Sequence, residues 1–301
     1  MKYNRNNAVL MLVIMVIVGF SLSAIFNNMR EFNMNIKAYN YKINKCNTIS
    51  NNDTTIINYC NEIKKWGGPK RSDTFFTFFD ILFDDRFTIM QILLPFLIIM
   101  CSISKINEKL KSGFIKNELL RQKYKSFVIK EWIDSLKKLF IIPFMFLIIA
   151  VAAYILTGNF DYKNSLLNFN PWVNPIFFDN IVISIIIYLT NFLLHGIFII
   201  NIGYIATKKS RGYIFSVLTA YISYLGLWAI SETFFGYFIM SGLLKKPELH
   251  NYFSFTTLWG YPDINNFVLF TLYQAIITII SCICFYLSYR NKEGVLIANE
   301  Q

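Results

Sequence analysis

Residues 181–206 read IVISIIIYLTNFLLHGIFIINIGYIA, a run without a single Asp, Glu, Lys or Arg. A helix needs about 20 mostly apolar residues to cross the hydrocarbon core of a bilayer, which is about 30 Å thick. This run is long enough to cross, and a charge at its centre would cost roughly 2.5–3.5 kcal/mol on insertion. It therefore predicts a transmembrane helix.

Five further charge-free windows follow the same pattern: 8–26, 87–103, 139–156, 213–230 and 266–289. The composition agrees, since 55% of the 301 residues are hydrophobic and 16% are charged, against about 25% charged residues in a soluble protein. Such a chain could not cover its apolar surface in water, which excludes a soluble enzyme, a coiled coil and a disordered chain. We expect an all-α, polytopic membrane protein in which residues 1–301 form a single transmembrane domain of six spans.

The distribution of basic residues predicts the orientation of the spans. With the N-terminus inside, the inner segments 1–7, 104–138, 207–212 and 290–301 carry the whole formal charge of +11, and the outer segments carry none. Cytoplasmic loops are enriched in Lys and Arg, so we expect a multi-pass protein of a cell membrane with both termini in the cytoplasm. Contact with anionic membrane lipid then accounts for the basic charge without nucleic acid. The Asn-, Ile- and Lys-rich composition is typical of a bacterial chain.

The largest outer segment is 27–86, which we expect to be an extracellular loop with a polar, Asn-rich first half. Its last part, DTFFTFFDILFDDR at 73–86, either lies at the membrane interface as an amphipathic segment or packs as a helix on the rim of the bundle. Cys46 and Cys60 fall in this loop and could form a disulfide on the outer face. A second outer element, TFFGYFIMSGLL at 233–244, is too short to span and predicts a re-entrant or interfacial helix.

The longest inner segment, 104–138, carries both basic residues and a short motif. The motif begins at Glu108 and continues through Ser112, Gly113, Phe114, Lys116, Leu120, Arg121 and Tyr124. On its residues alone, the segment is either a basic helix on the inner leaflet or a docking element for a cytoplasmic partner.

This motif and the six-span topology resemble the permease subunits of ABC transporters of the ABC-2 type, whose motif runs E…sG-x-ik…ll…(s/y)(r/k)…K. The resemblance implies a cytoplasmic coupling helix in 104–138 on which a separate ABC ATPase subunit docks, and short extracellular helices before the last span. It also implies a second permease subunit, the same or a related chain. The chain departs from the family in its short segment before the first span, where the family often has a connecting helix, and in its long first outer segment.

The resemblance implies that the partner subunit, and not this chain, hydrolyses ATP. The chain has no GxxxxGK[ST] phosphate loop, so we expect no cofactor on this chain, with ATP and Mg bound by the ATPase. The expected function is that of a non-enzymatic permease subunit of an ATP-driven exporter. Its substrate would be amphipathic, such as a peptide, an antibiotic or a lipid-like molecule.

Polar residues recur at helical spacing within two spans. They are Ser184, Tyr188, Asn191 and His195 in one span, and Thr271, Gln274 and Thr278 in the other. Each set predicts one polar helix face, which could line a substrate path or hydrogen-bond to another helix.

Two other classes of function stay open on the sequence. A membrane sensor or scaffold would use 27–86 as its receptor, and an intramembrane enzyme would need His195 to be joined by a carboxylate that its span lacks. With two His and no CxxC pair, we expect no metal site.

Overall fold

The computed structural model of the protein describes residues 5–48, 54–66, 74–82, 84–111, 123–158, 181–210, 212–253, 255 and 267–290. These residues form helices and no strand. Six of the described helical segments are long and apolar enough to span a membrane, which confirms an all-α polytopic membrane protein. The elements are α1 (Arg5–Thr48), α2 (Thr54–Trp66), α3 (Thr74–Leu82), α4 (Asp85–Lys111), α6 (Tyr124–Lys137), η1 (Lys138–Phe140), α7 (Ile141–Thr157), α10 (Ile181–Lys209), α11 (Tyr213–Ile230), η2 (Ser231–Leu243), η3 (Pro247–Phe253) and α12 (Phe267–Tyr289).

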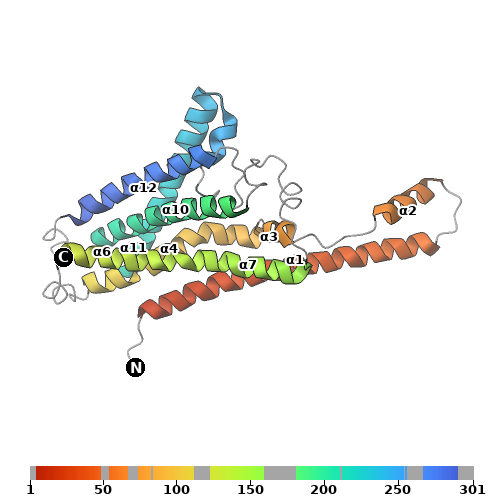
Figure 1. Cartoon of the computed structure of the whole chain (residues 1–301), viewed down its shortest axis with the longest axis horizontal. Helices are drawn as coiled ribbons and strands as arrows, with labels where there is room; N and C mark the ends of the chain where they lie inside the picture. Colours follow the sequence, from red (N-terminus) through yellow and green to blue (C-terminus); the bar gives the residue numbers. More distant parts are fainter. Residues whose placement is uncertain are drawn as a thin grey trace.

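The spans run alternately up and down the bundle, so that their ends gather at two opposite sides. At one side α1 begins, α4 ends, α6 begins, α10 ends, α11 begins and α12 ends (Figure 1). We call this side the basic end, because the helix termini there carry most of the lysines of the described spans. The opposite side holds α2, α3 and the pair of elements η2 and η3, and we call it the outer end.

The centre of the bundle is formed by α4 and α10. In the most apolar part of each span, 61% of α4 and 50% of α10 is buried, against 22–28% of the other four spans. Large aliphatic side chains such as Ile99 and Ile103 on α4 and Ile199 on α10 are fully buried. The other four spans therefore leave most of their apolar surface uncovered within the chain, where the bilayer can cover it.

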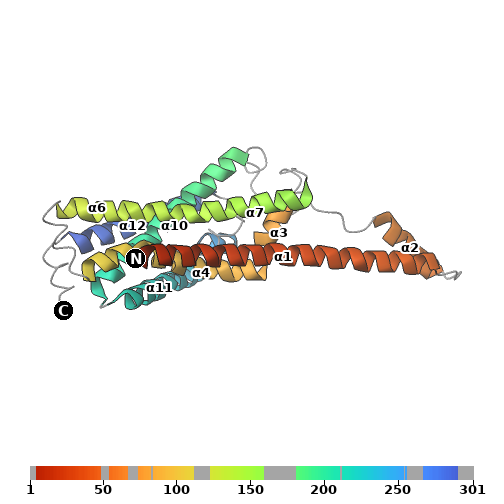
Figure 2. The same cartoon turned by 90° about the horizontal axis from the view of Figure 1, so that it is seen from below.

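The first span is much longer than expected, which corrects the prediction of a loop in the first half of 27–86. Helix α1 has 44 residues, so it is about 66 Å long at 1.5 Å per residue, roughly twice the thickness of the hydrocarbon core. Between Gly19 and Thr48 the chain holds no Gly or Pro, so no helix-breaking residue stops it where the apolar run ends. Figures 1 and 2 show α1 continuing past the bundle.

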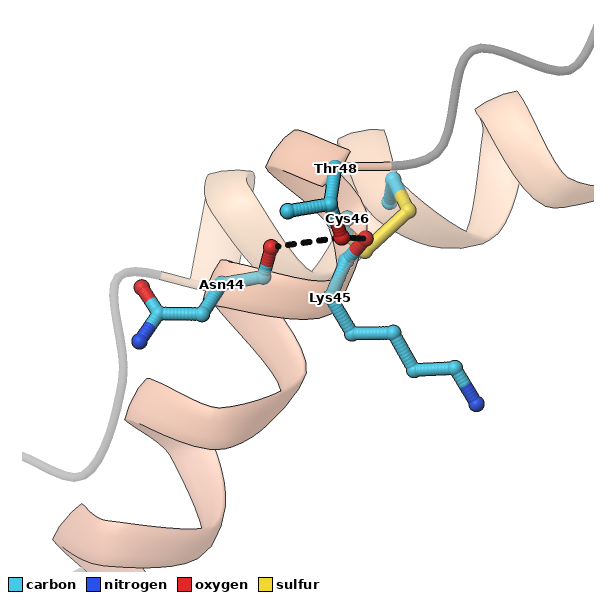
Figure 3. Close-up of a disulfide and its surroundings, with 5 residues drawn as sticks. Asn44, Lys45, Cys46 and Thr48 are labelled. Atoms are coloured by element: carbon cyan, nitrogen blue, oxygen red, sulfur yellow. Dashed lines mark hydrogen bonds between the residues drawn. A yellow bond between two sulfur atoms is a disulfide. The ribbon is translucent and has the colours of Figure 1, made fainter.

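A disulfide joins the far end of α1 to α2. Cys46 and Cys60 are 14 residues apart in the sequence, and their Cα atoms lie 5.6 Å apart across the bond (Figure 3). Beside it Thr48 closes the helix, donating its hydroxyl to the carbonyl of Lys45 at 2.9 Å. The end of α1 and helix α2 therefore form a helical hairpin that is closed by a disulfide, to which we refer as the α1–α2 hairpin.

The segment after this hairpin, helix α3, packs against the bundle, as one of the two interpretations of 73–86 required. Phe79, Ile81 and Leu82 are buried, and α3 lies against α7 and α1. Thr74 and Thr157 join α3 to the end of α7 through their hydroxyls, which are 2.8 Å apart. The aromatic cluster of 73–86 thus serves as a packing surface.

The helix expected at 233–244 is present as η2, and it continues the fifth span directly. Helix α11 runs without interruption into η2, a π-helix that ends with the Leu244 N–H donating to the carbonyl of Ile239 at 2.9 Å. The chain then reverses, and η3 lies back along η2. Gly236 allows this approach, since a Cβ there would lie 2.7 Å from Cδ2 of His250.

Candidate functional site

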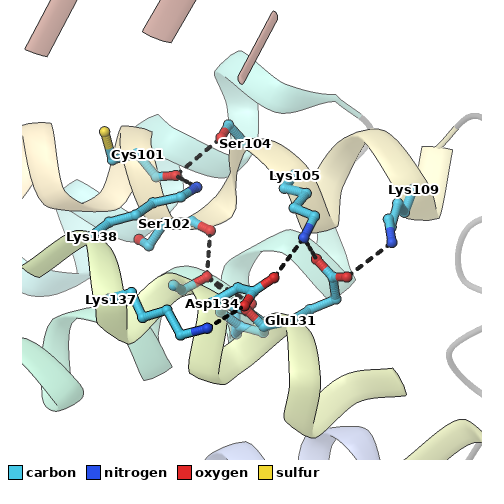
Figure 4. A network of polar contacts seen from close by, with 11 residues as sticks. Cys101, Ser102, Ser104, Lys105, Lys109, Glu131, Asp134, Lys137 and Lys138 are labelled. Carbon is cyan, nitrogen blue, oxygen red and sulfur yellow. Dashed lines mark hydrogen bonds and ion pairs between the residues drawn. The ribbon is translucent and has the colours of Figure 1, made fainter. Parts of the chain in front are cut away.

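The basic end contains a group of charged side chains that the apolar helices hold at their termini. On α4, Lys105 and Lys109 are four residues apart and therefore share one helix face. On α6, Glu131 and Asp134 are three residues apart and face α4 (Figure 4). Together with Lys137 these residues form what we call the α4–α6 ion-pair network.

The distances in this network are those of direct ion pairs. Lys109 Nζ lies 2.9 Å from Oε1 of Glu131, and Lys105 Nζ lies 3.3 Å from Oε2 of Glu131. Lys105 also reaches Asp134 at 2.7 Å, and Lys137 contacts the other oxygen of Asp134 at 3.2 Å. The side chain of Glu131 is only 2% exposed, whereas that of Asp134 is 29% exposed, so Glu131 is the buried centre of the network.

Hydrogen bonds connect the network to the central helix α10. Ser135, one turn after Glu131, donates to the carbonyl of Ser102 on α4 at 2.8 Å, and its oxygen lies 2.9 Å from the hydroxyl of Tyr204 on α10. The indole N–H of Trp132 donates to Asn201 of α10 at 2.9 Å. Helix α6 is therefore bonded to both central helices.

From α10 the bonding continues to α12 and from α4 to α11. Asn201 donates its amide to the hydroxyl of Ser281 on α12 at 2.9 Å. Asn107 on α4 donates to the hydroxyl of Ser216 on α11 at 3.1 Å. All of these side chains are buried or half-buried, so they join the five helices at the basic end by directional contacts.

The predicted docking motif begins on α4 and ends on α6, the two helices that carry this network, and most of it falls outside the described residues. Ser112, Gly113, Phe114, Lys116, Leu120 and Arg121 belong to 112–122, which the structure does not describe. Glu108 is exposed near the end of α4, and Tyr124 begins α6. The ion-pair network thus lies at the two helices that enter and leave 112–122.

The two predicted polar faces, on α10 and α12, meet one another. Asn191 donates to the hydroxyl of Thr271 at 3.1 Å, and His195 Nδ1 lies 3.2 Å from the amide oxygen of Gln274. Thr278 donates to the backbone carbonyl of Leu194 at 2.8 Å. These contacts favour hydrogen bonding between helices over a substrate path for the residues that make them.

One member of the α10 face makes a different contact. Tyr188 packs edge-on against Phe146 of α7, with ring centroids 5.5 Å apart. The side chain of Ser184 lies outside the described residues. His195 is fully buried, with its Nε2 3.1 Å from the hydroxyl of Tyr224 and its ring against Phe255. Its neighbours here are an amide, a phenol and an aromatic ring, which suit a structural hydrogen bond better than an acid–base pair.

We expect substitutions in the polar contact between α10 and α12 to lower the free energy of unfolding. The loss should grow with the number of buried polar atoms that are left without a hydrogen-bond partner. Asn191→Leu should cost about 0.6 kcal/mol, the average for a hydrogen bond between membrane helices. His195→Leu should cost about 1–3 kcal/mol, because it leaves buried polar atoms of Gln274 and Tyr224 unsatisfied. Thermal unfolding in detergent measures both, with Thr190→Leu on the exposed side of α10 as the control. Unchanged unfolding with loss of transport would instead favour a substrate path.

The residues of the ion-pair network were not predicted from the sequence, where they contributed only to the net charge of the inner segment 104–138. The signal that could have found them is the combination of two lysines and two carboxylates at helical spacing, each beside an apolar span. Among the described residues, no group of three or more His, Cys, Asp or Glu side chains could hold a metal ion.

Comparison of the chain with family models, with curated proteins and with solved structures finds no match. The topology and the contacts at the basic end are therefore the features of this chain that bear on its function.

Proposed function

We propose that this chain is the membrane-spanning permease subunit of an ATP-driven ABC exporter of the ABC-2 type. In this proposal a separate ATPase binds the segment 112–122 at the basic end, and a second permease subunit completes the conduit. The substrate class is amphipathic: a peptide, an antibiotic or a lipid-like molecule. The observation that carries the proposal is that ion pairs and hydrogen bonds join α4, α6 and α10, and that the motif connects α4 to α6 in the sequence. A subunit without its own ATP site must receive force through a rigid part.

The proposed orientation places the basic end in the cytoplasm of a bacterial cell. Two independent features support it. The lysines of α4 and α6 follow the positive-inside tendency, and the disulfide between Cys46 and Cys60 lies at the opposite end, where an extracellular compartment would be oxidising enough to keep it.

The proposal predicts that an ATPase subunit depends on the charges of the 112–122 segment. The tagged chain, purified in mild detergent with the ATPase that is co-expressed with it, should retain ATP hydrolysis sensitive to vanadate. Lys116→Glu or Arg121→Glu should lower the retained ATPase about tenfold, because reversal places like charges against an acidic partner surface. Arg290→Glu is the matched control, since Arg290 is exposed at the same end but directly follows α12. ATPase retention that survives replacement of all of 108–121 would contradict the proposal.

The α1–α2 hairpin supports a second candidate, a membrane sensor that uses the hairpin as its receptor. The specific observation is that α1 continues as a helix beyond the bundle and that a disulfide joins its last turn to α2. Deletion of 30–72 separates the candidates: a transporter should keep its bound ATPase, whereas a sensor should lose its response while no ATPase is found.

A further inference from the structure

Glu131 is an unusual choice at its position on α6. The neighbouring inward residues Phe127 and Val128 are apolar and buried, and an apolar residue at 131 would have packed with them. A buried carboxylate has to be compensated by nearby positive charge, and replacing a buried ion pair by apolar residues is often neutral or stabilising. Stability alone therefore does not explain why a carboxylate stands here.

The ion pairs of Glu131 connect α6 to α4, and this connection offers a different explanation for the carboxylate. Both lysines that hold Glu131 come from α4, at 2.9 Å and 3.3 Å, and Lys109 lies two residues before the end of that helix. Glu131 itself lies seven residues after the start of α6. The pair therefore joins the last turn of one helix to the second turn of the other, where the chain leaves for 112–122 and returns from it.

The same turn of α6 is bonded onward to the centre of the bundle. Ser135 contacts the hydroxyl of Tyr204, and Trp132 donates to Asn201, both on α10. Because α6 contacts α10 directly, a displacement applied at 112–122 would shift α4, α6 and α10 together only if α4 and α6 kept their relative position. Ser135 and Ser102 also join α6 to α4, but Glu131 supplies the most buried charge between these two helices in the described network.

We propose that Glu131 is a positioning residue that fixes α4 to α6 through Lys105 and Lys109, so that both helices move as one piece with α10. The inference deepens the proposed function, because the force it would transmit comes from the docked ATPase. The fixed geometry of α4 and α6, however, is a property of this chain by itself and can be measured without any partner.

The first experiment measures the distance between α4 and α6. Spin labels are placed at positions 108 and 125, both exposed, in a chain whose free cysteines Cys101, Cys282 and Cys284 are replaced by alanine. Pulsed electron resonance should give one narrow distance distribution for the parent chain. Glu131→Gln should roughly double its width, since two lysines then lack their buried counter-charge.

Two further variants separate positioning from folding. Asp134→Asn is the matched control and should keep the narrow distribution, because Asp134 is partly exposed and Lys105 retains Glu131. The double variant Lys109→Gln/Glu131→Gln removes the uncompensated charge and should recover the thermal stability of the parent, yet keep the broad distribution. A narrow distribution in Glu131→Gln or in the double variant overturns the inference.

The second experiment asks whether the fixed pair transmits motion. In the chain with its ATPase bound, labels at Ile155 on α7 and Val268 on α12, both exposed near the outer end, should change distance on addition of ATP and vanadate. Glu131→Gln should bind the ATPase equally and reduce the shifted population about tenfold, whereas an unchanged shift overturns the inference. If no ATPase binds the parent chain, the proposed function fails, and the first experiment still decides whether Glu131 positions α4 and α6.

Discussion

Replacement of Gly203 by valine should separate α10 from α4 and lower the free energy of unfolding by about 3 kcal/mol, the upper part of the usual range for overpacking. A Cβ at Gly203 would lie 2.7 Å from Cγ2 of Ile103. That methyl is attached to the Cβ of a fully buried, β-branched side chain, so it can turn away only by leaving the one χ1 rotamer that such a side chain strongly prefers in a helix. Small residues of this kind let membrane helices approach closely.

Two other glycines make this prediction specific. Gly226→Val on α11 should be nearly neutral, because no atom lies within 4 Å of the position of its Cβ. Gly196→Ala should fall between the two, since its Cβ would meet Cδ1 of Leu139 at 2.6 Å, the movable end of a flexible side chain. Thermal unfolding in detergent, followed by size-exclusion chromatography, ranks the three. Equal midpoints for Gly203→Val and Gly226→Val would show that α4 and α10 do not pack as described.

Loss of the disulfide should open the α1–α2 hairpin without unfolding the spans. Closing a loop of 14 residues contributes about 3 kcal/mol, so Cys46→Ser should raise the open population of the hairpin roughly 100-fold. Limited trypsin digestion reports this as faster cleavage after Lys42 and Lys45, both of which are exposed on α1.

Two controls accompany the limited trypsin digestion. Cys284→Ser removes an exposed free thiol of α12 and should not change the cleavage rate, and a reductant should accelerate cleavage of the parent chain but not of Cys46→Ser. On intact cells, cleavage by added trypsin should occur in the hairpin if the outer end faces the medium. Cleavage that is indifferent to both reductant and substitution would mean that the bond does not stabilise the hairpin.

The sequence predicted the spans well because each of them is recognisable by itself. A window such as 213–230 has to exclude charges along its whole length, and the cost of one charge does not depend on which helix lies beside it. The sequence did not predict that two helices extend beyond their charge-free segments. Helix α1 continues to Thr48, and α11 continues into η2, because the end of an apolar run is not a helix stop signal.

In the candidate site, too, the sequence predicted the properties of single helices but not how the helices pair. Spacing alone placed Asn191 and His195 on one face of a helix and Gln274 and Thr278 on one face of another, but not the two faces against each other. The pairing of Glu131 with Lys109 could not be predicted from spacing either. The two residues are 22 positions apart and belong to different helices, so the helical period does not relate them.

What the sequence by itself determined is the number of spans, their polar faces and the side of the membrane that its lysines favour, because hydropathy, helical period and charge are properties of each segment. Only the tertiary structure decided that α4 and α10 form the centre, that Cys46 meets Cys60, and that Glu131 lies between two lysines of another helix. These facts depend on how whole helices pack, and packing is settled by shape and by partners that lie far apart in the chain.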